Sequence, residues 1–119
     1  MSISISMPKP DRTRIKICGL RDEAHIDAAV DAGADAIGFV LFDKSPRYVD
    51  ARRAGELARR LPPFVTPVLL VVNASYDAIE EGLAQVPQAA LQFHGDEPPA
   101  FCESLRRPYL RAVAMKRGV

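Results

Sequence analysis

Three side chains suited to proton transfer or anion binding stand out in this sequence: Cys18, Arg47 and His94. A cysteine thiolate can act as a base, and helix N-termini and cations favour that ionised form. An arginine can hold a carboxylate or phosphate through paired hydrogen bonds, and a histidine can exchange protons near neutral pH. Each residue also has a simpler interpretation: an inert buried thiol, a solvent-facing arginine, and a structural histidine at a strand end.

The other cysteine and histidine, Cys102 and His25, fall within predicted helices. We interpret Cys102 as a packing residue and His25 as solvated surface. Two cysteines cannot form a disulfide framework, which favours a reducing, cytoplasmic location. The two histidines lack the spacing of zinc ligands, so no metal site is predicted.

The length and composition indicate one globular domain. The chain has 119 residues, of which 48% are hydrophobic and 26% charged. A complete (β/α)₈ barrel needs at least about 200 residues, so this chain is too short to form one. No apolar run approaches the ~18 residues of a membrane-spanning helix. Residues 1–13 are predicted to be a flexible N-terminal extension without the features of a signal peptide.

Positive charge is concentrated at the end of the chain. Residues 104–119 contain five basic residues and no acidic one, although the net charge of the whole chain is only +1. A basic segment can bind nucleic acid, but no aromatic residues suited to base stacking are interspersed with these charges. We therefore interpret the segment as a solvated helix end and loop, and we expect neither a nucleic-acid nor a membrane partner.

Short apolar segments alternate with longer helical patterns along the chain. Strands are predicted at residues 13–18, 35–42, 66–72, 89–93 and 109–115. Three helices are predicted after capping residues: from Asp22 to Gly33, from Asp50 to Leu61, and from Ser75 to residue 86. A fourth helix is predicted over 98–107, where prolines open the first turn. Strict alternation of strand and helix is typical of an α/β fold with parallel strands.

Two architectures fit this alternation: an open doubly wound sheet or part of a (β/α)₈ TIM barrel. A nucleotide-binding open sheet usually has a glycine-rich turn after a strand, whereas Gly19 stands alone after the first predicted strand. This difference favours the barrel. Active sites of such barrels lie at the carboxyl ends of the strands, where Cys18, the 41–49 loop with Arg47, and the segment with Gln92 and His94 are expected.

Four segments carry a resemblance to a known family. They are KICGLR at 16–21, GADAIGFVLFDKSPRYV at 33–49, LPPFVTPVLLVVN at 61–73 and LQFHGDE at 91–97. With these motifs in this order, the chain resembles phosphoribosylanthranilate isomerase, a (β/α)₈-barrel enzyme of tryptophan biosynthesis. The resemblance runs from about Arg14 to Ala114.

The resemblance implies an Amadori rearrangement of N-(5-phosphoribosyl)anthranilate to 1-(2-carboxyphenylamino)-1-deoxyribulose 5-phosphate. Cys18 matches the family's general base, and Arg47 matches the arginine that binds the anthranilate carboxylate. Gln92 and His94 match residues that line the substrate pocket. The reaction needs no metal or organic cofactor, because the substrate nitrogen serves as the electron sink. Family members are cytoplasmic monomers or homodimers.

One departure from the family pattern concerns the C-terminal half of the barrel. The family's general acid is an aspartate at the end of the sixth strand, and its phosphate is bound by loops after the seventh and eighth. Only five strands are predicted here, so we expect residues 14–119 to be the N-terminal part of a barrel, truncated and inactive alone. A non-catalytic half-barrel module that assembles with a complementary chain remains an alternative. A third interpretation, another phosphosugar barrel enzyme of related chemistry, would require the KICG and KSPRY motifs to coincide by chance.

Overall fold

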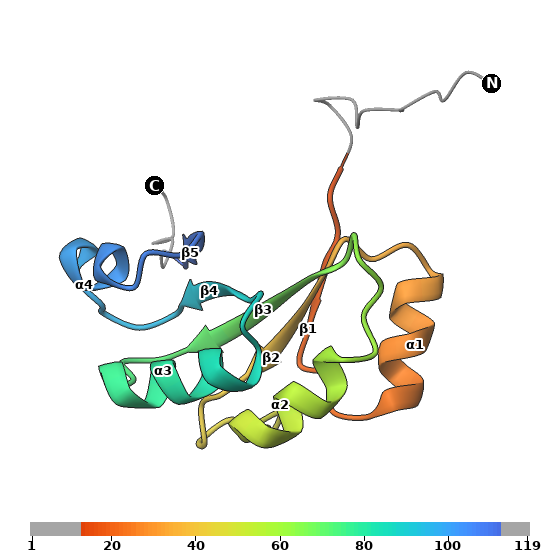
Figure 1. The fold of residues 1–119 in the computed structure, drawn as a ribbon, viewed down its shortest axis with the longest axis horizontal. Helices are drawn as coiled ribbons and strands as arrows, with labels where there is room; N and C mark the ends of the chain where they lie inside the picture. The colour runs from red at the N-terminus through yellow and green to blue at the C-terminus, as the bar shows by residue number, and fades with distance from the viewer. Residues whose placement is uncertain (1–12, 113–119) are drawn as a thin grey trace, which may run out of the picture.

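The computed structural model describes residues 13–112, within which five strands alternate with four helices (Figure 1). The strands are β1 (Lys16–Cys18), β2 (Ala36–Val40), β3 (Thr66–Val71), β4 (Ala90–Phe93) and β5 (Tyr109–Arg111). The helices are α1 (Glu23–Asp31), α2 (Ala51–Ala58), α3 (Tyr76–Gln85) and α4 (Pro99–Ser104). The predicted number and order of elements are therefore confirmed. The predicted extension at 1–13 and the end of the fifth predicted strand lie largely outside the described residues.

All strand pairs are parallel, and the sheet order β1-β2-β3-β4-β5 follows the sequence. Consecutive parallel strands joined by helices are the repeating unit of a (β/α)₈ barrel. Because every strand runs the same way, the carboxyl ends of all five meet at one edge of the sheet. The segments expected to carry the site leave the strands at that edge.

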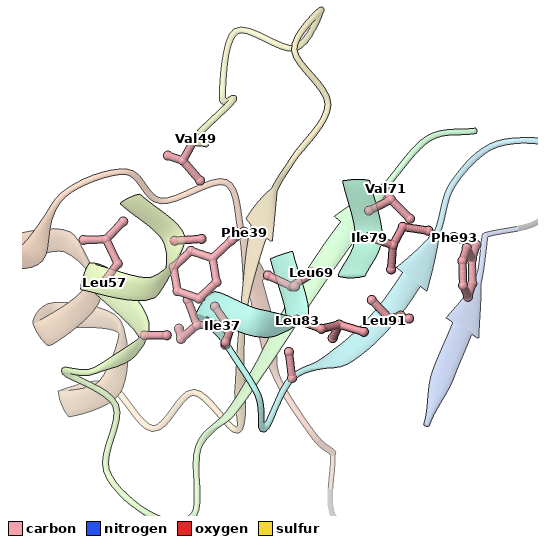
Figure 2. Packing of buried hydrophobic residues seen from close by; sticks show 14 of the residues in the cluster. Ile37, Phe39, Val49, Leu57, Leu69, Val71, Ile79, Leu83, Leu91 and Phe93 are labelled. Carbon is pink, nitrogen blue, oxygen red and sulfur yellow. The ribbon is translucent and has the colours of Figure 1, made fainter. Parts of the chain in front are cut away.

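The core lies between the sheet and the helices. Figure 1 shows α1, α2 and α3 along the same side of the sheet. On that side, β2 contributes Ile37 and Phe39 and β4 contributes Leu91 and Phe93, each at most 1% exposed. Figure 2 shows Ile37 and Phe39 on the side of Leu57 of α2. It shows Leu91 and Phe93 beside Ile79 and Leu83 of α3. Burial of this apolar layer is the main force that holds the helices on the sheet.

The opposite face of the sheet carries a row of aligned residues from four strands. Cys18 pairs with Gly38, Gly38 with Val68, and Val68 with Ala90. Side chains alternate between faces along a strand, so this row points away from the helix-covered core. Two residues of this row, Cys18 and Gly38, lie at the candidate site.

Three predicted helix starts are confirmed by side-chain caps. The carboxylates of Asp22 and Asp50 accept hydrogen bonds from the third residue after each, at 2.9 and 2.8 Å. The hydroxyl of Ser75 caps α3 in the same way, at 3.1 Å. Such bonds satisfy backbone N–H groups that have no partner inside the helix.

The second helix is shorter than predicted. It was expected to reach Leu61, but it ends at Ala58. The backbone N–H groups of Arg60 and Leu61 bond to Leu57 and Ala58, three residues back. These tighter bonds close the last turn before the Pro62-Pro63 pair, which cannot continue a helix. The fourth helix, predicted over 98–107, is also shorter and covers Pro99–Ser104.

Ion pairs join α1 to the α2 segment on the outer surface. Arg53 contacts the carboxylate of Glu23 at 2.7 Å, and Arg60 contacts Asp27 at 2.5 Å. The Arg53 guanidinium lowers the pKa of Glu23 from 4.5 to about 2.

None of the helices within residues 13–112 is long and apolar enough to cross a lipid bilayer.

Candidate functional site

Cys18 is the last residue of β1, and its thiol lies over Gly38 of the neighbouring strand. A Cβ atom added to Gly38 would stand only 2.5 Å from Cys18 Sγ. The absence of a side chain at Gly38 therefore leaves the space that the thiol occupies. Cys18 is partly exposed, whereas Cys102 is fully buried. Burial raises the pKa of the Cys102 thiol, which agrees with its predicted role in packing.

Gly19 turns the chain sharply after Cys18. Its φ of +87° lies in the left-handed region that glycine adopts readily, and its N–H donates to the carbonyl of Gly38 at 3.0 Å. The side chain of Arg47 lies directly against this turn. A Cβ atom on Gly19 would be 2.4 Å from Arg47 Cδ. The predicted base and the predicted anion-binding residue are thus brought to the same turn.

The 41–49 loop holds Arg47 there through its own hydrogen bonds. The Arg47 N–H donates to Ser45 Oγ at 3.1 Å, and the Tyr48 N–H donates to the Ser45 carbonyl at 3.1 Å. The loop then returns to the sheet, because the Val49 N–H donates to Val40 at 2.9 Å. The loop therefore has a defined shape, and the position of Arg47 follows from it.

His94 follows β4 and faces the same region. Its N–H donates to the Val71 carbonyl at 2.9 Å, which extends the pairing of β3 and β4 by one residue. Cys18, Arg47 and His94 border one pocket of about 350 Å³, whose complete lining is Cys18, Val40, Phe42, Ser45, Arg47, Leu70, Val72 and His94. The structure brings these three predicted site residues together.

A second, wider hollow adjoins the first at the same edge of the sheet. It has a volume of about 710 Å³ and shares Val72 and His94 with the first pocket. Its other lining residues are Asn73, Gly95, Asp96, Arg111 and Ala112. His94 stands where the two hollows meet.

Gln92 occupies a different position from the other predicted site residues. It lies on β4, and its Oε1 accepts a hydrogen bond from Lys16 Nζ of β1 across the open face of the sheet. It is not among the residues that line the pocket of Cys18, Arg47 and His94. Its role in binding substrate stays a prediction.

Sequence reasoning gave no role to Glu97, which the structure buries beside the site with 4% of its surface exposed. Its carboxylate accepts hydrogen bonds from the backbone N–H groups of Asn73 and Gly95. Nothing in the run of Asp96, Glu97 and Pro98 distinguishes the buried acid from its exposed neighbour. Only the three-dimensional arrangement identifies it.

The site combines an ionisable thiol, a guanidinium and an imidazole around one partly apolar pocket. This set can bind an anionic group and remove a proton from a carbon beside it. Within residues 13–112, no group of three or more His, Cys, Asp or Glu side chains lies close enough together to hold a metal ion.

Curated relatives match most of this chain. The N-(5'-phosphoribosyl)anthranilate isomerase of Leptothrix cholodnii is 60% identical over 109 residues, which is 92% of this chain and 50% of that protein. The enzyme of the same name from Methylibium petroleiphilum is 60% identical over 107 residues, 90% of this chain and 50% of that protein. The chain therefore spans about half the length of the curated relatives it matches.

Solved structures give the same result for the fold. A phosphoribosyl anthranilate isomerase in complex with reduced 1-(o-carboxyphenylamino)-1-deoxyribulose 5-phosphate matches with a TM-score of 0.83 and 36% identity, covering 88% of this chain and 55% of that one. The Thermotoga maritima enzyme matches with a TM-score of 0.81 and 36% identity, covering 86% of this chain and 51% of that one. The predicted partial TIM-barrel architecture is confirmed.

A family model matches nearly the whole chain. The model described as N-(5'phosphoribosyl)anthranilate (PRA) isomerase matches residues 15–118. This range contains Cys18, Arg47, Gln92 and His94 and all five described strands. The resemblance inferred from four motifs is confirmed, and the chain belongs to the N-(5'-phosphoribosyl)anthranilate isomerase family.

Proposed function

We propose that the protein, as a complete barrel, isomerises N-(5'-phosphoribosyl)anthranilate to 1-(2-carboxyphenylamino)-1-deoxyribulose 5-phosphate in tryptophan biosynthesis. Family membership supports the reaction. The observation that carries the proposal is the contact of Arg47 with the Gly19 turn, directly after Cys18. That contact supports the proposed pairing of a cation for the substrate carboxylate, Arg47, with a base for the sugar, Cys18.

Arg47 would hold the anthranilate carboxylate. A guanidinium suits this group because its N–H donors match the two carboxylate oxygens. The pocket beside it has apolar walls from Val40, Phe42 and Leu70, against which an aromatic ring can pack. Its volume of about 350 Å³ lies within the range of small-molecule sites.

Cys18 would remove the proton in the central step. Protonation of the ribose ring oxygen breaks its bond to C1 and leaves an iminium between C1 and the substrate nitrogen. The iminium acidifies the C2–H bond, and the Cys18 thiolate takes that proton to give an enolamine. Tautomerisation, with protonation at C1, then yields the C2 ketone. His94, at the border of the pocket, would contact the substrate, as would Gln92 if it leaves Lys16.

The proposal assigns neither the general acid nor the phosphate-binding groups to a residue of this chain. In the family they follow the sixth, seventh and eighth strands, and five strands are described here. β1 and β5 each have a single neighbouring strand in the described sheet. We therefore propose that residues 14–119 form the N-terminal part of the barrel and that further strands complete the site.

The setting of the reaction follows from the same proposal. We place the protein in the cytoplasm, with two free cysteines as support. The complete protein would be a monomer or homodimer. One related structure is of monomers generated from the dimeric Thermotoga maritima enzyme. No metal, organic cofactor, nucleic acid or membrane takes part in the proposed reaction.

An assay of two proteins tests the proposal. The full-length product of the gene and the isolated 119-residue chain are each incubated with freshly made N-(5'-phosphoribosyl)anthranilate. We expect turnover by the full-length product and none above background by the isolated chain. Absence of turnover by a folded full-length product would refute the proposed activity. Turnover by the isolated chain would refute the need for further strands.

A further inference from the structure

Glu97 is the only charged side chain that is buried among the described residues. It lies in the segment between β4 and α4, four residues after Phe93. A carboxylate withdrawn from water is costly unless its oxygens are hydrogen-bonded. Both oxygens of Glu97 have hydrogen-bond partners.

The two oxygens bind backbone amides of two different loops. Oε2 accepts from the N–H of Asn73, after β3, at 2.8 Å. Oε1 accepts from the N–H of Gly95, after β4, at 2.9 Å. Hydrogen bonds to an ionised acceptor are stronger than neutral ones. One carboxylate thus joins the loops that follow two adjacent strands.

Asn73 strengthens the same link from the opposite loop. Its backbone adopts a φ of +48°, and its Oδ1 accepts from the Asp96 N–H at 2.9 Å. A Cβ atom on Gly95 would stand 2.7 Å from that Oδ1, so the loops approach too closely for a side chain there. We call this set of four residues, Asn73, Gly95, Asp96 and Glu97, the Glu97 clamp.

His94 lies inside the clamped segment. Its own N–H is held by Val71, and the next N–H along the chain, that of Gly95, is held by Glu97. The carbonyl of Glu97 also accepts from Arg111 Nη2 at 3.0 Å, which ties the clamp to β5. The backbone that carries the imidazole is therefore fixed on both sides.

We infer that Glu97 is a positioning residue that sets where the His94 imidazole stands at the pocket of Cys18 and Arg47. Glu97 itself lines neither hollow, so it acts through the loop and not by contact with a ligand. The expected effect of Glu97 on turnover rests on the proposed function. Its effect on the position of the His94 imidazole does not depend on that function.

The test replaces Glu97 with glutamine in the full-length product. Glu97→Gln keeps the side-chain size but turns one acceptor into an N–H₂ donor, which would face a backbone N–H. We expect kcat/KM to fall by about 10- to 100-fold, because small misplacements of site groups cost this much. In a His94→Ala background the same substitution should change kcat/KM by less than about twofold, since the two residues act as a unit. Fully additive losses would overturn the inference.

Nuclear magnetic resonance provides a readout that needs no substrate. The imidazole Cε1–H signal of His94, assigned through the His94→Ala variant, should shift or broaden in Glu97→Gln. Asn73→Gly can keep the positive φ, removes the side-chain amide with its Oδ1 acceptor, and should move the same signal. If Glu97→Gln fails to fold, the His94 signal of Asn73→Gly is the measurement that tests the inference. A His94 signal unchanged in Asn73→Gly and in any folded Glu97→Gln would overturn the inference.

A matched control separates positioning from general loss of stability. Asp27→Asn removes a carboxylate that binds Arg60 on the outer surface. It should leave the His94 signal and kcat/KM at the level of the unaltered protein. A wild-type protein without isomerase activity would refute the proposed function, while the His94 signal would still decide whether the clamp positions the imidazole.

Discussion

The Cys18 thiol fills the space that a side chain on Gly38 would need, with Sγ 2.5 Å from the position of a Cβ at Gly38. The two residues are register partners on adjacent parallel strands. The sheet itself therefore places the thiol at its open face, beside the pocket. Gly38 on β2 therefore leaves the room in which the thiol on β1 lies.

Gly38→Ala should displace the Cys18 thiol. Overpacking at such a position costs about 1–3 kcal/mol of unfolding free energy, and turnover of the full-length product should fall with it. In a Cys18→Ala background the clash is removed, so the same substitution should cost much less. Denaturant unfolding of the four proteins of this cycle measures the coupling. Equal costs in both backgrounds would show that the thiol does not occupy this space.

Gly19→Ala and Gly33→Ala form a matched pair. Both glycines have a positive φ, +87° and +99°, so each alanine pays a similar backbone penalty of about 1–2 kcal/mol. Only Gly19 touches Arg47, whereas a Cβ on Gly33 meets nothing within 4 Å. We expect KM to rise several-fold in Gly19→Ala and to stay unchanged in Gly33→Ala. Equal KM values in the two variants would contradict the proposed placement of Arg47.

The fold was predictable because local signals agreed with one another. The caps Asp22, Asp50 and Ser75 indicated three helices, prolines indicated the fourth, and the apolar segments indicated the five strands. Parallel pairing then implied that Cys18 and the loop with Arg47 lie at the same edge. The expected end of α2 was wrong by three residues, because tighter bonds at Arg60 and Leu61 close that turn.

Contacts between distant side chains were beyond prediction from the sequence. The contact of Cys18 with Gly38 depends on which residues of β1 and β2 pair with each other, and these two residues are far apart in the sequence. The burial of Glu97 depends on where two loops meet, and its neighbour Asp96 is exposed. The bond between Lys16 and Gln92 depends on the open face of the sheet, which no local pattern describes.

Arg47→Ala should weaken substrate binding more than it slows the chemical step. The guanidinium would bind the carboxylate equally in substrate and transition state, so KM rises while kcat changes little. Arg47→Lys keeps the charge but loses the paired donors, and we expect it to restore binding only in part. Lys44→Ala, in the same loop, is the control. Steady-state kinetics showing no effect on KM would make Arg47 a merely solvent-facing residue.

Stability at acid pH should depend on the Glu23–Arg53 pair. The folded pKa of Glu23 is about 2, below its ordinary value of 4.5, because Arg53 binds the carboxylate. The stabilising contribution is therefore complete above pH 4.5 and is lost as the pH falls toward 2. Unfolding of the parent protein and Glu23→Gln should differ least at pH 2 and most above pH 4.5. A difference that does not change with pH would contradict this assignment.

The most direct test of the central claim is the steady-state kinetics of Cys18→Ser in the full-length product. A serine hydroxyl keeps the size of the group but is a far weaker proton acceptor than a thiolate. We predict that kcat falls by about 10²–10⁴-fold, the usual contribution of a general base, while KM stays within a few-fold. Cys102→Ala, which alters the buried cysteine, should retain kcat. A Cys18→Ser protein with unchanged kcat would contradict the account.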